Sequence, residues 1–290
     1  MNPIKIQDKE DIIKMENILK YDDFLHSRDE RFNTMIMAGY DLKTDDRGIS
    51  YLGEEVIRRQ HNKVVVGGAV GLLKHMFGAT TELTTDTLNK LMNIGLDATA
   101  LANETPKVCL FNIGIGGCGA SYADKKVTLD QENIVKQIIP FRVVDTPTDI
   151  KENDKYFFHK VMENGKHAYY LKAFESAPTI HSLFKDGIDG NDGTELVGNP
   201  ADYDRTDGVE TFVEIILRIT AQDLREYFAI YDDPDYPRFN TIGLCMAKKG
   251  KASDGSTEYV DVNQFSVLNF SNEMLHFDKD LSIIYRVYMS

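Results

Sequence analysis

Residues 109–121, CLFNIGIGGCGAS, decide between two classes of fold. An apolar run typical of a β-strand ends in Gly114, Gly116 and Gly119, whose spacing fits G-x-G-x-x-G, the pattern of a dinucleotide phosphate loop. That loop works only where a helix begins directly after the third glycine, because the helix N–H groups then face the pyrophosphate. The pattern also belongs to a doubly wound parallel sheet, so the surrounding sequence must alternate strands and helices.

The residues after Gly119 do not meet these requirements. Val127, Leu129 and Ile134 build no apolar helical stripe close behind the glycines, and Asp145 lies 31 residues after Gly114, where the ribose-binding acid is expected after about 20. No further βαβ unit follows. We interpret the cluster as a strand end at which glycines let a neighbouring backbone pack closely. A nucleotide-binding enzyme that uses Gly114, Gly116 and Gly119 stays the alternative function.

Outward from this stretch, helix and strand signals are segregated along the chain, which favours an α+β fold over alternating α/β. We predict a mostly helical region over residues 1–105 and a larger, mainly antiparallel β-rich domain over 106–290. A long acidic surface loop is expected near 185–210. Helical patterns occur at 9–21, 64–78 and 84–103, and strand patterns at 107–115, 138–145, 156–174, 210–220, 238–249, 258–270 and 281–290.

Three local signals are the clearest. Asn164-Gly165 joins two aromatic-rich runs and predicts a hairpin with a type I′ turn, because both residues tolerate positive φ. Thr220 and Asp223 form a potential capping box that opens a helix over 221–231. The glycines of the 64–78 helix would let another backbone approach closely.

The bulk composition is that of a globular protein. Of the 290 residues, 42% are hydrophobic and 27% charged, and the net charge of −13 argues against sequence-specific nucleic-acid binding, since phosphates are repelled. Three cysteines without a C-x-x-C pair indicate a reducing compartment and no disulfide scaffold. The most apolar window, 64–78, is too short for a bilayer span and contains Lys74 and His75. We therefore expect a soluble cytoplasmic protein with no membrane partner.

No residue set predicts catalysis, and we expect no catalytic residues, no cofactor and no metal. Asp189, Asn191 and Asp192 lie in an acidic stretch, but Gly193 occupies a ligand position of the EF-hand pattern, so surface turns are favoured and an irregular calcium site stays the alternative. His159 and His167 flank the Asn164-Gly165 turn, which predicts a cross-strand surface pair rather than a metal site.

The C-terminal segment carries a family resemblance. Residues 239–290 contain an IGL-type strand, a polar excursion, the strand FSVLNF and the final strand LSIIYRVYMS, in that order. This order resembles the closing segment of tailed-bacteriophage virion proteins of the neck, tail and baseplate, and FNIGIGG at 111–117 is similar. The resemblance covers about 50 residues and matches no single family over the whole chain.

The resemblance implies a non-enzymatic subunit that assembles into a homo-oligomeric ring with other virion proteins. It implies a location in the virion after assembly in the host cytoplasm. The negative charge then suits a passive DNA conduit, because like charges keep DNA from adhering. The expected interaction surfaces are the 185–210 loop and the terminal strand.

Overall fold

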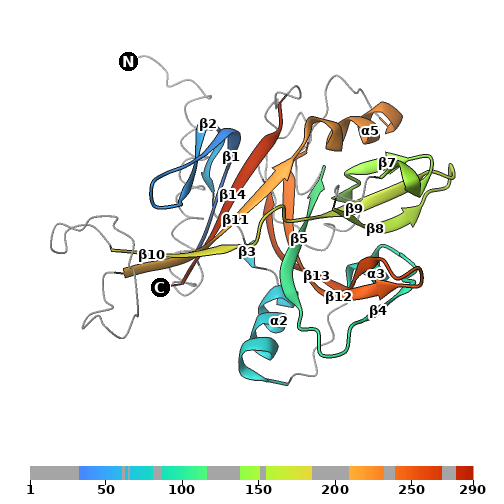
Figure 1. Cartoon of the computed structure of the whole chain (residues 1–290), viewed down its shortest axis with the longest axis horizontal. Coiled ribbons are helices and arrows are strands. Elements are labelled where there is room, and N and C mark those ends of the chain that lie inside the picture. Colours follow the sequence, from blue (N-terminus) through green and yellow to red (C-terminus); the bar gives the residue numbers. More distant parts are fainter. Residues whose placement is uncertain are drawn as a thin grey trace, which may run out of the picture.

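The computed structural model describes residues 33–60, 63–64, 66–80, 87–115, 138–150, 155–184, 209–231, 239–269 and 279–289, which are dominated by antiparallel β-sheet (Figure 1). The strands are β1 (Asn33–Thr44), β2 (Ser50–Gln60), β3 (Lys63–Val64), β4 (Ala98–Ala100), β5 (Lys107–Gly114), β6 (Ile138–Ile139), β7 (Arg142–Val144), β8 (Tyr156–Val161), β9 (His167–Ala173), β10 (Thr179–Phe184), β11 (Val209–Ile219), β12 (Thr241–Ala252), β13 (Thr257–Asn269) and β14 (Leu281–Met289). The helices are α2 (Val66–Phe77), α3 (Leu88–Leu91), α5 (Ala221–Tyr231) and the 3₁₀ turn Pro147–Asp149.

The predicted α+β class, with a mostly helical region over 1–105, is wrong. The described part of that region begins with the long strands β1 and β2, and its helical residues are those of α2 and the four-residue α3. At the start of β1, apolar residues occupy both faces of the strand: Ile36 and Ala38 enter one core and Met37 another. A strand buried on both faces shows no polar alternation. The helix predicted at 9–21 lies outside the described residues.

Two sheets organise the molecule. The first has five strands in the order β10-β11-β14-β1-β2, and the second has nine, with the path β3-β13-β12-β5-β9-β7 and the additional strands β4, β6 and β8. Every strand pair is antiparallel. Strands from both sides of residue 105 share each sheet, since β1 pairs with β14 and β4 pairs with β12.

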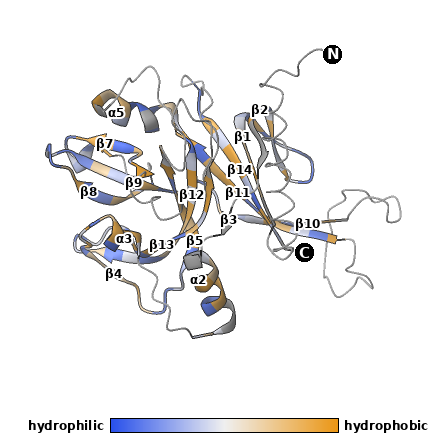
Figure 2. Cartoon of the chain, turned by 180° about the vertical axis from the view of Figure 1, so that it is seen from behind, coloured by the Kyte–Doolittle hydropathy of each residue, from blue (hydrophilic) through white to orange (hydrophobic). Residues whose placement is uncertain are grey.

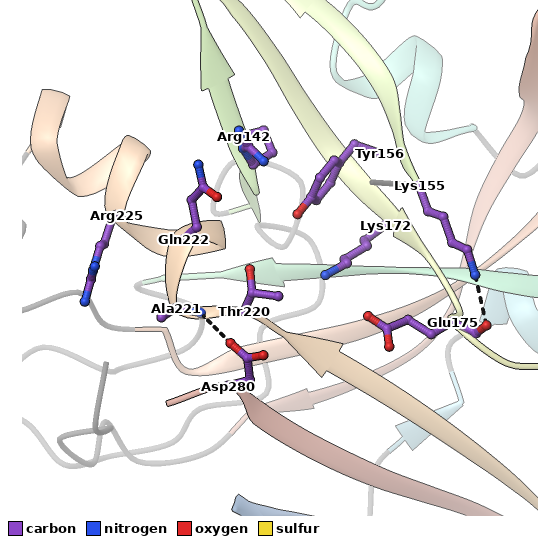
Figure 3. Close-up of a pocket in the computed structure, with 10 residues that line it drawn as sticks. All are labelled: Arg142, Lys155, Tyr156, Lys172, Glu175, Thr220, Ala221, Gln222, Arg225 and Asp280. Atoms are coloured by element: carbon purple, nitrogen blue, oxygen red, sulfur yellow. Dashed lines mark hydrogen bonds between the residues drawn. The ribbon is translucent and has the colours of Figure 1, made fainter. Parts of the chain in front are cut away.

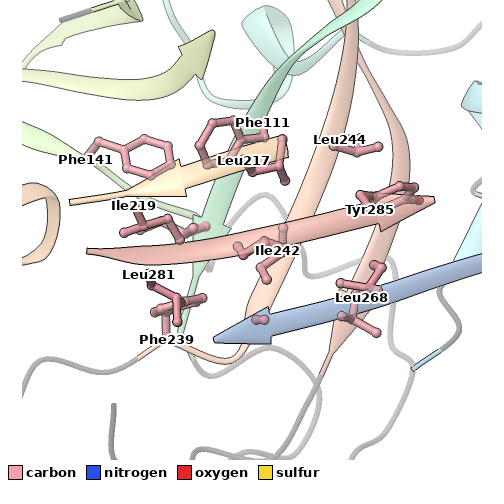
Figure 4. Close-up of a cluster of buried hydrophobic side chains, with 14 of the residues drawn as sticks. Phe111, Phe141, Leu217, Ile219, Phe239, Ile242, Leu244, Leu268, Leu281 and Tyr285 are labelled. Atoms are coloured by element: carbon pink, nitrogen blue, oxygen red, sulfur yellow. The ribbon is translucent and has the colours of Figure 1, made fainter. Parts of the chain in front are cut away.

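The main core lies between the two sheets (Figure 4). Tyr285 of β14 packs there and its hydroxyl lies 2.7 Å from the Ser266 hydroxyl of β13, which links the sheets. Phe111 and Phe141 meet edge to face with ring centroids 5.1 Å apart. The same cluster includes residues of β1, β11 and β14 on one side and of β5, β12 and β13 on the other: Ile36, Ala38, Ile215, Leu217, Ile283, Ile113, Ile242, Leu244, Phe265 and Leu268.

A second core covers part of the other face of the nine-stranded sheet, where Leu88 of α3 packs, whereas α2 lies beside Phe265 and Met246 of the main core; Figure 2 shows the hydropathy of these elements. Gly68 lets α2 touch β13, because a Cβ at this position would lie 2.2 Å from the Phe265 carbonyl oxygen. The close backbone approach predicted from the glycines of the 64–78 helix is therefore confirmed. None of the helices in the described ranges is long and apolar enough to cross a bilayer.

The predicted hairpin over 156–174 is confirmed, but its turn is of another type. β8 and β9 pair antiparallel, and Gly165 has a φ of +80° whereas Asn164 does not have positive φ. The Gly165 N–H donates to the Met162 carbonyl at 2.9 Å, and the Met162 N–H to Lys166 at 2.8 Å. This is a type I turn closed by a glycine bulge, in which one residue takes the left-handed conformation.

The tip of the β1–β2 hairpin folds over the outer face of the five-stranded sheet. Register shifts on either side of Ala38 allow the bend. The Ser50 N–H donates to Glu214 of β11 at 3.0 Å, and Arg286 of β14 donates to the Ser50 carbonyl at 2.6 Å and to Glu214 at 2.9 Å. The hairpin tip is thus fastened to β11, which is not a sheet neighbour of β1 or β2, as well as to the neighbouring β14.

Candidate functional site

The start of α5 organises the most polar site of the described structure. The Thr220 N–H donates to the Asp223 carboxylate at 2.7 Å, and the Asp223 N–H donates to the Thr220 carbonyl at 3.0 Å. This pairing satisfies backbone groups at the helix start, and a carboxylate there also interacts well with the helix dipole. The helix predicted over 221–231 is confirmed.

Asp223 is the centre of a buried hydrogen-bond network. Its carboxylate is fully buried and accepts hydrogen bonds from the Tyr156 hydroxyl and, at 2.9 Å, from the Lys172 ammonium. Lys172 is only 3% exposed and also donates to the Arg218 carbonyl at 3.0 Å. Burial, and then the negative charge of Asp223, raise the pKa of Tyr156 far above its usual value. The phenol therefore keeps its proton and acts as a donor.

A second ion pair continues this network along α5. Arg142 of β7 forms a bidentate ion pair with the Glu226 carboxylate. Its Nε lies 3.0 Å from Oε2 and its Nη2 lies 2.9 Å from Oε1. The Val143 N–H donates to the same carboxylate at 3.0 Å. Burial lowers the pKa of Arg142, but the hydrogen bond to Glu226 and its charge outweigh burial, so the pKa is raised. The two ion pairs together fasten α5 to β7 and β9.

Arg142, Tyr156 and Lys172 of this network line a cavity of about 640 Å³ (Figure 3). Tyr156 and Lys172 point toward the first turn of α5, and Lys155 at the rim donates to the Glu175 carbonyl at 2.9 Å. The Ala221 N–H is already engaged, since it donates to Asp280 at 3.2 Å. The lining residues are Arg142, Lys155, Tyr156, Lys172, Glu175, Thr220, Ala221, Gln222, Arg225 and Asp280.

The network is suited to holding a helix in place rather than to proton transfer. The buried Asp223 and the half-buried Glu226 are both ion-paired and accept backbone N–H groups as well. A general base needs a lone pair within reach of a substrate proton, and a nucleophile needs a lowered pKa. Tyr156 has the opposite shift. The arrangement therefore stabilises the packing of α5 on the sheet.

The two predicted cross-strand histidines do meet. His159 Nε2 lies 2.7 Å from His167 Nδ1, with the rings nearly parallel and 4.8 Å between centroids, and Tyr169 stacks on His159 at 5.0 Å. Burial, and then the charge of His167, lower the pKa of His159. Within the described residues, no group of three or more His, Cys, Asp or Glu side chains is placed to hold a metal ion.

The remaining candidate residues fall into two groups. Gly114 is described: it ends β5, pairs with Thr241 and Ile138 on neighbouring antiparallel strands, and accepts the Asn240 N–H at 2.9 Å. This sheet differs from the parallel sheet that a dinucleotide loop requires. Gly116 and Gly119, with the predicted helix start after them, lie outside the described residues, as do Asp189, Asn191 and Asp192.

Sequence reasoning missed most of the buried network. Tyr156 and Lys172 reach Asp223 from 67 and 51 residues away, so no spacing rule connects them. One signal was present: Lys172 interrupts the apolar run of HAYYLKAF, where a charged side chain at a buried position demands a partner. No protein-family model, no curated protein and no solved structure matches this chain.

Proposed function

We propose that this protein is a non-enzymatic structural subunit of a tailed-phage virion, at the neck, tail or baseplate, which acts by assembly into an oligomeric ring. The observation that carries the proposal is the chemistry of the α5 network. Its buried acid Asp223 and its half-buried acid Glu226 are each neutralised by a buried cation, as in a framework built to hold its shape.

The place of the C-terminal segment supports the same proposal. The residues that resemble virion proteins form β12 and β13 in the nine-stranded sheet and β14 in the middle of the five-stranded sheet. The resemblance thus concerns the framework of the molecule and not an appendage. Within the described ranges both sheets end in edge strands, and a sheet edge can be extended by strands of a neighbouring molecule.

The assembly state of the purified protein tests the proposal. Native mass spectrometry and negative-stain imaging over a range of concentrations are expected to show closed oligomers. Proteomics of virions from the phage that encodes the chain is expected to find it as a stoichiometric component. A protein that stays monomeric at the highest concentration and is missing from the particles would overturn the proposal.

A ligand titration separates this proposal from the nucleotide-binding alternative. A ligand bound well above its Kd stabilises a protein by a few kcal/mol, which raises the melting temperature. We expect no change in melting temperature with ATP or NAD(H). A saturable increase that is lost in a Gly116→Val variant would favour the enzyme instead.

A further inference from the structure

The strand edges of the described structure differ in how well they are protected against pairing with another chain. Exposed edges in soluble proteins usually carry charges, prolines or bulges, or are very short. β2, at one end of the five-stranded sheet, has register shifts on its pairing with β1 and exposes Glu54 and Glu55. This edge is protected.

The edges of the nine-stranded sheet are also protected. β3, β4, β6 and β7 are two or three residues long. β8 is longer, but Phe158 has a φ of +68°, which distorts the strand, and Lys160 donates to the Met92 carbonyl at 3.1 Å. Neither short nor distorted strands offer a regular ladder for a partner.

β10 has none of these devices. Its sequence, TIHSLF, contains no proline and no Lys, Arg, Asp or Glu, and it pairs with β11 over six consecutive residues without a register shift. It forms one end of the five-stranded sheet in the described part of the chain (Figure 1). Ile180 is 71% exposed, more than any other large apolar side chain of the described residues. An unprotected, apolar edge of this kind is a pairing site.

We infer that β10 pairs with β10 of a second copy of this chain, antiparallel about a two-fold axis, so that two five-stranded sheets join into one. This inference rests on the proposed function, because it names one contact through which the subunits would assemble. The two-fold pair is closed, so a ring would be built from such pairs through further contacts.

The odd number of antiparallel strands in this sheet favours β10–β10 pairing over a head-to-tail contact between β10 and β2. All neighbours in the five-stranded sheet are antiparallel, so β10 and β2, at its two ends, run in the same direction. A head-to-tail contact would therefore need a parallel pair at the charged β2 edge. Self-pairing about a two-fold axis keeps the sheet antiparallel and brings two uncharged strands together, with Ile180 of each copy covered by its partner.

A charge placed on this edge tests the inference. Ile180→Lys would put a hydrated ammonium on each of two adjoining strands, and we expect the dissociation constant of the pair to rise at least about tenfold. Val161→Lys, which replaces another exposed apolar residue on the β8 edge, is the matched control and should leave association unchanged. Both variants alter exposed side chains, so thermal unfolding should show that each subunit still folds.

Disulfide trapping reports the geometry. A background with Cys109→Ser and Cys118→Ser removes two of the native thiols. In this background a single cysteine is introduced by Ile180→Cys or by Ser182→Cys. We expect the one that lies nearer the two-fold axis to form a disulfide with the same residue of the second copy. A disulfide between Ser182→Cys and Glu54→Cys of another copy, with no self-linked product, would show head-to-tail pairing and overturn the inference.

The outcomes separate the inference from the proposed function. If the protein assembles but Ile180→Lys associates like the wild type, the β10 contact is wrong and assembly stands. If the wild type is monomeric at all concentrations, both the contact and assembly are wrong.

Discussion

At the scale of single residues, Asp223 has the most demanding position in the described structure. It is fully buried and holds Tyr156, Lys172 and the Thr220 N–H at once. Removing one member of a buried ion pair is costly because the other is left charged without a partner. The stability of α5 on the sheet should therefore depend on this carboxylate.

Asp223→Asn is expected to lower the free energy of unfolding by about 3 kcal/mol, since Lys172 would stay buried without a counter-charge. Urea unfolding followed by circular dichroism measures the change. The matched control is Asp145→Asn, which breaks the exposed pair with Lys166 and should cost less than about 1 kcal/mol. Equal losses in the two variants would contradict the role assigned to Asp223.

The histidine pair predicts a pH dependence. The folded pKa of His159 lies below its ordinary value of 6.5, so the unfolded chain binds the extra proton first. The lowered pKa of His159 therefore contributes to the free energy of unfolding above pH 6.5. This contribution is lost as the pH falls from 6.5 to the lowered pKa of the folded protein. Denaturant unfolding between pH 7.5 and pH 5 should show the loss.

The His159→Gln variant should lose part of that pH dependence, because glutamine does not titrate. His75→Gln, which changes an exposed residue of α2, should keep the wild-type slope. The comparison of slopes removes the effect of carboxylates that titrate in the same range, since they are present in all three proteins.

At the scale of secondary-structure elements, helix propensity and tertiary packing have opposite preferences at Gly68 of α2. Alanine is about 1 kcal/mol better than glycine within a helix, so α2 would gain helix propensity by losing Gly68. The contact with β13 opposes this gain, because the Phe265 carbonyl occupies the space that a Cβ would need. The glycine is explained by packing and not by helix formation.

Gly68→Ala is therefore expected to destabilise the protein by about 1 to 2 kcal/mol despite the better propensity. Gly71→Ala on the same helix is the control: its Cβ would meet the Met246 methyl group, the end of a flexible side chain that can move. The free energies of unfolding of both variants in urea test the comparison. A stabilised Gly68→Ala variant would refute the close packing of α2 on β13.

The terminal strand shows how an element's place in the sheet changes its role. We expected residues 281–290 to present an interaction surface. β14 instead lies between β11 and β1, and both of its edges are hydrogen-bonded within the subunit. The edge that remains open in the described sheet belongs to β10, which sequence analysis did not single out.

At the scale of the whole molecule, the excess of acidic residues governs the interaction with nucleic acid. With a net charge of −13, the chain should repel duplex DNA unless cations gather on one face. In the described structure many cations are paired with acids, as Arg142 is with Glu226 and Lys172 with Asp223. These pairs reduce the charge available for phosphates.

We expect no retention of duplex DNA by the purified protein at physiological salt. Fluorescence anisotropy of a labelled duplex, titrated with protein, should stay flat. A saturable rise that weakens steeply with added salt would reveal a basic face and contradict the proposed passive conduit.

Most strands of residues 106–290, the β8–β9 hairpin and the start of α5 could be predicted from the sequence. These features depend on neighbours along the chain: side-chain alternation in β11, the glycine of the turn, and the Thr220–Asp223 cap. The similar segments FNIGI at 111–115 and FNTIGL at 239–244 both have the pattern of a strand that passes through a glycine, and β5 and β12 are neighbours in one sheet.

The sequence did not reveal the strands β1 and β2, the central place of β14 or the convergence of Tyr156 and Lys172 on Asp223, all of which depend on the folded chain. Strand pairing joins residues far apart in the chain, as Ile36 joins Tyr285, and no local pattern encodes that partner. A strand covered on both faces also lacks the alternation by which strands are recognised. Contacts between residues far apart in the chain, which the finished fold alone supplies, are the physical reason for the difference.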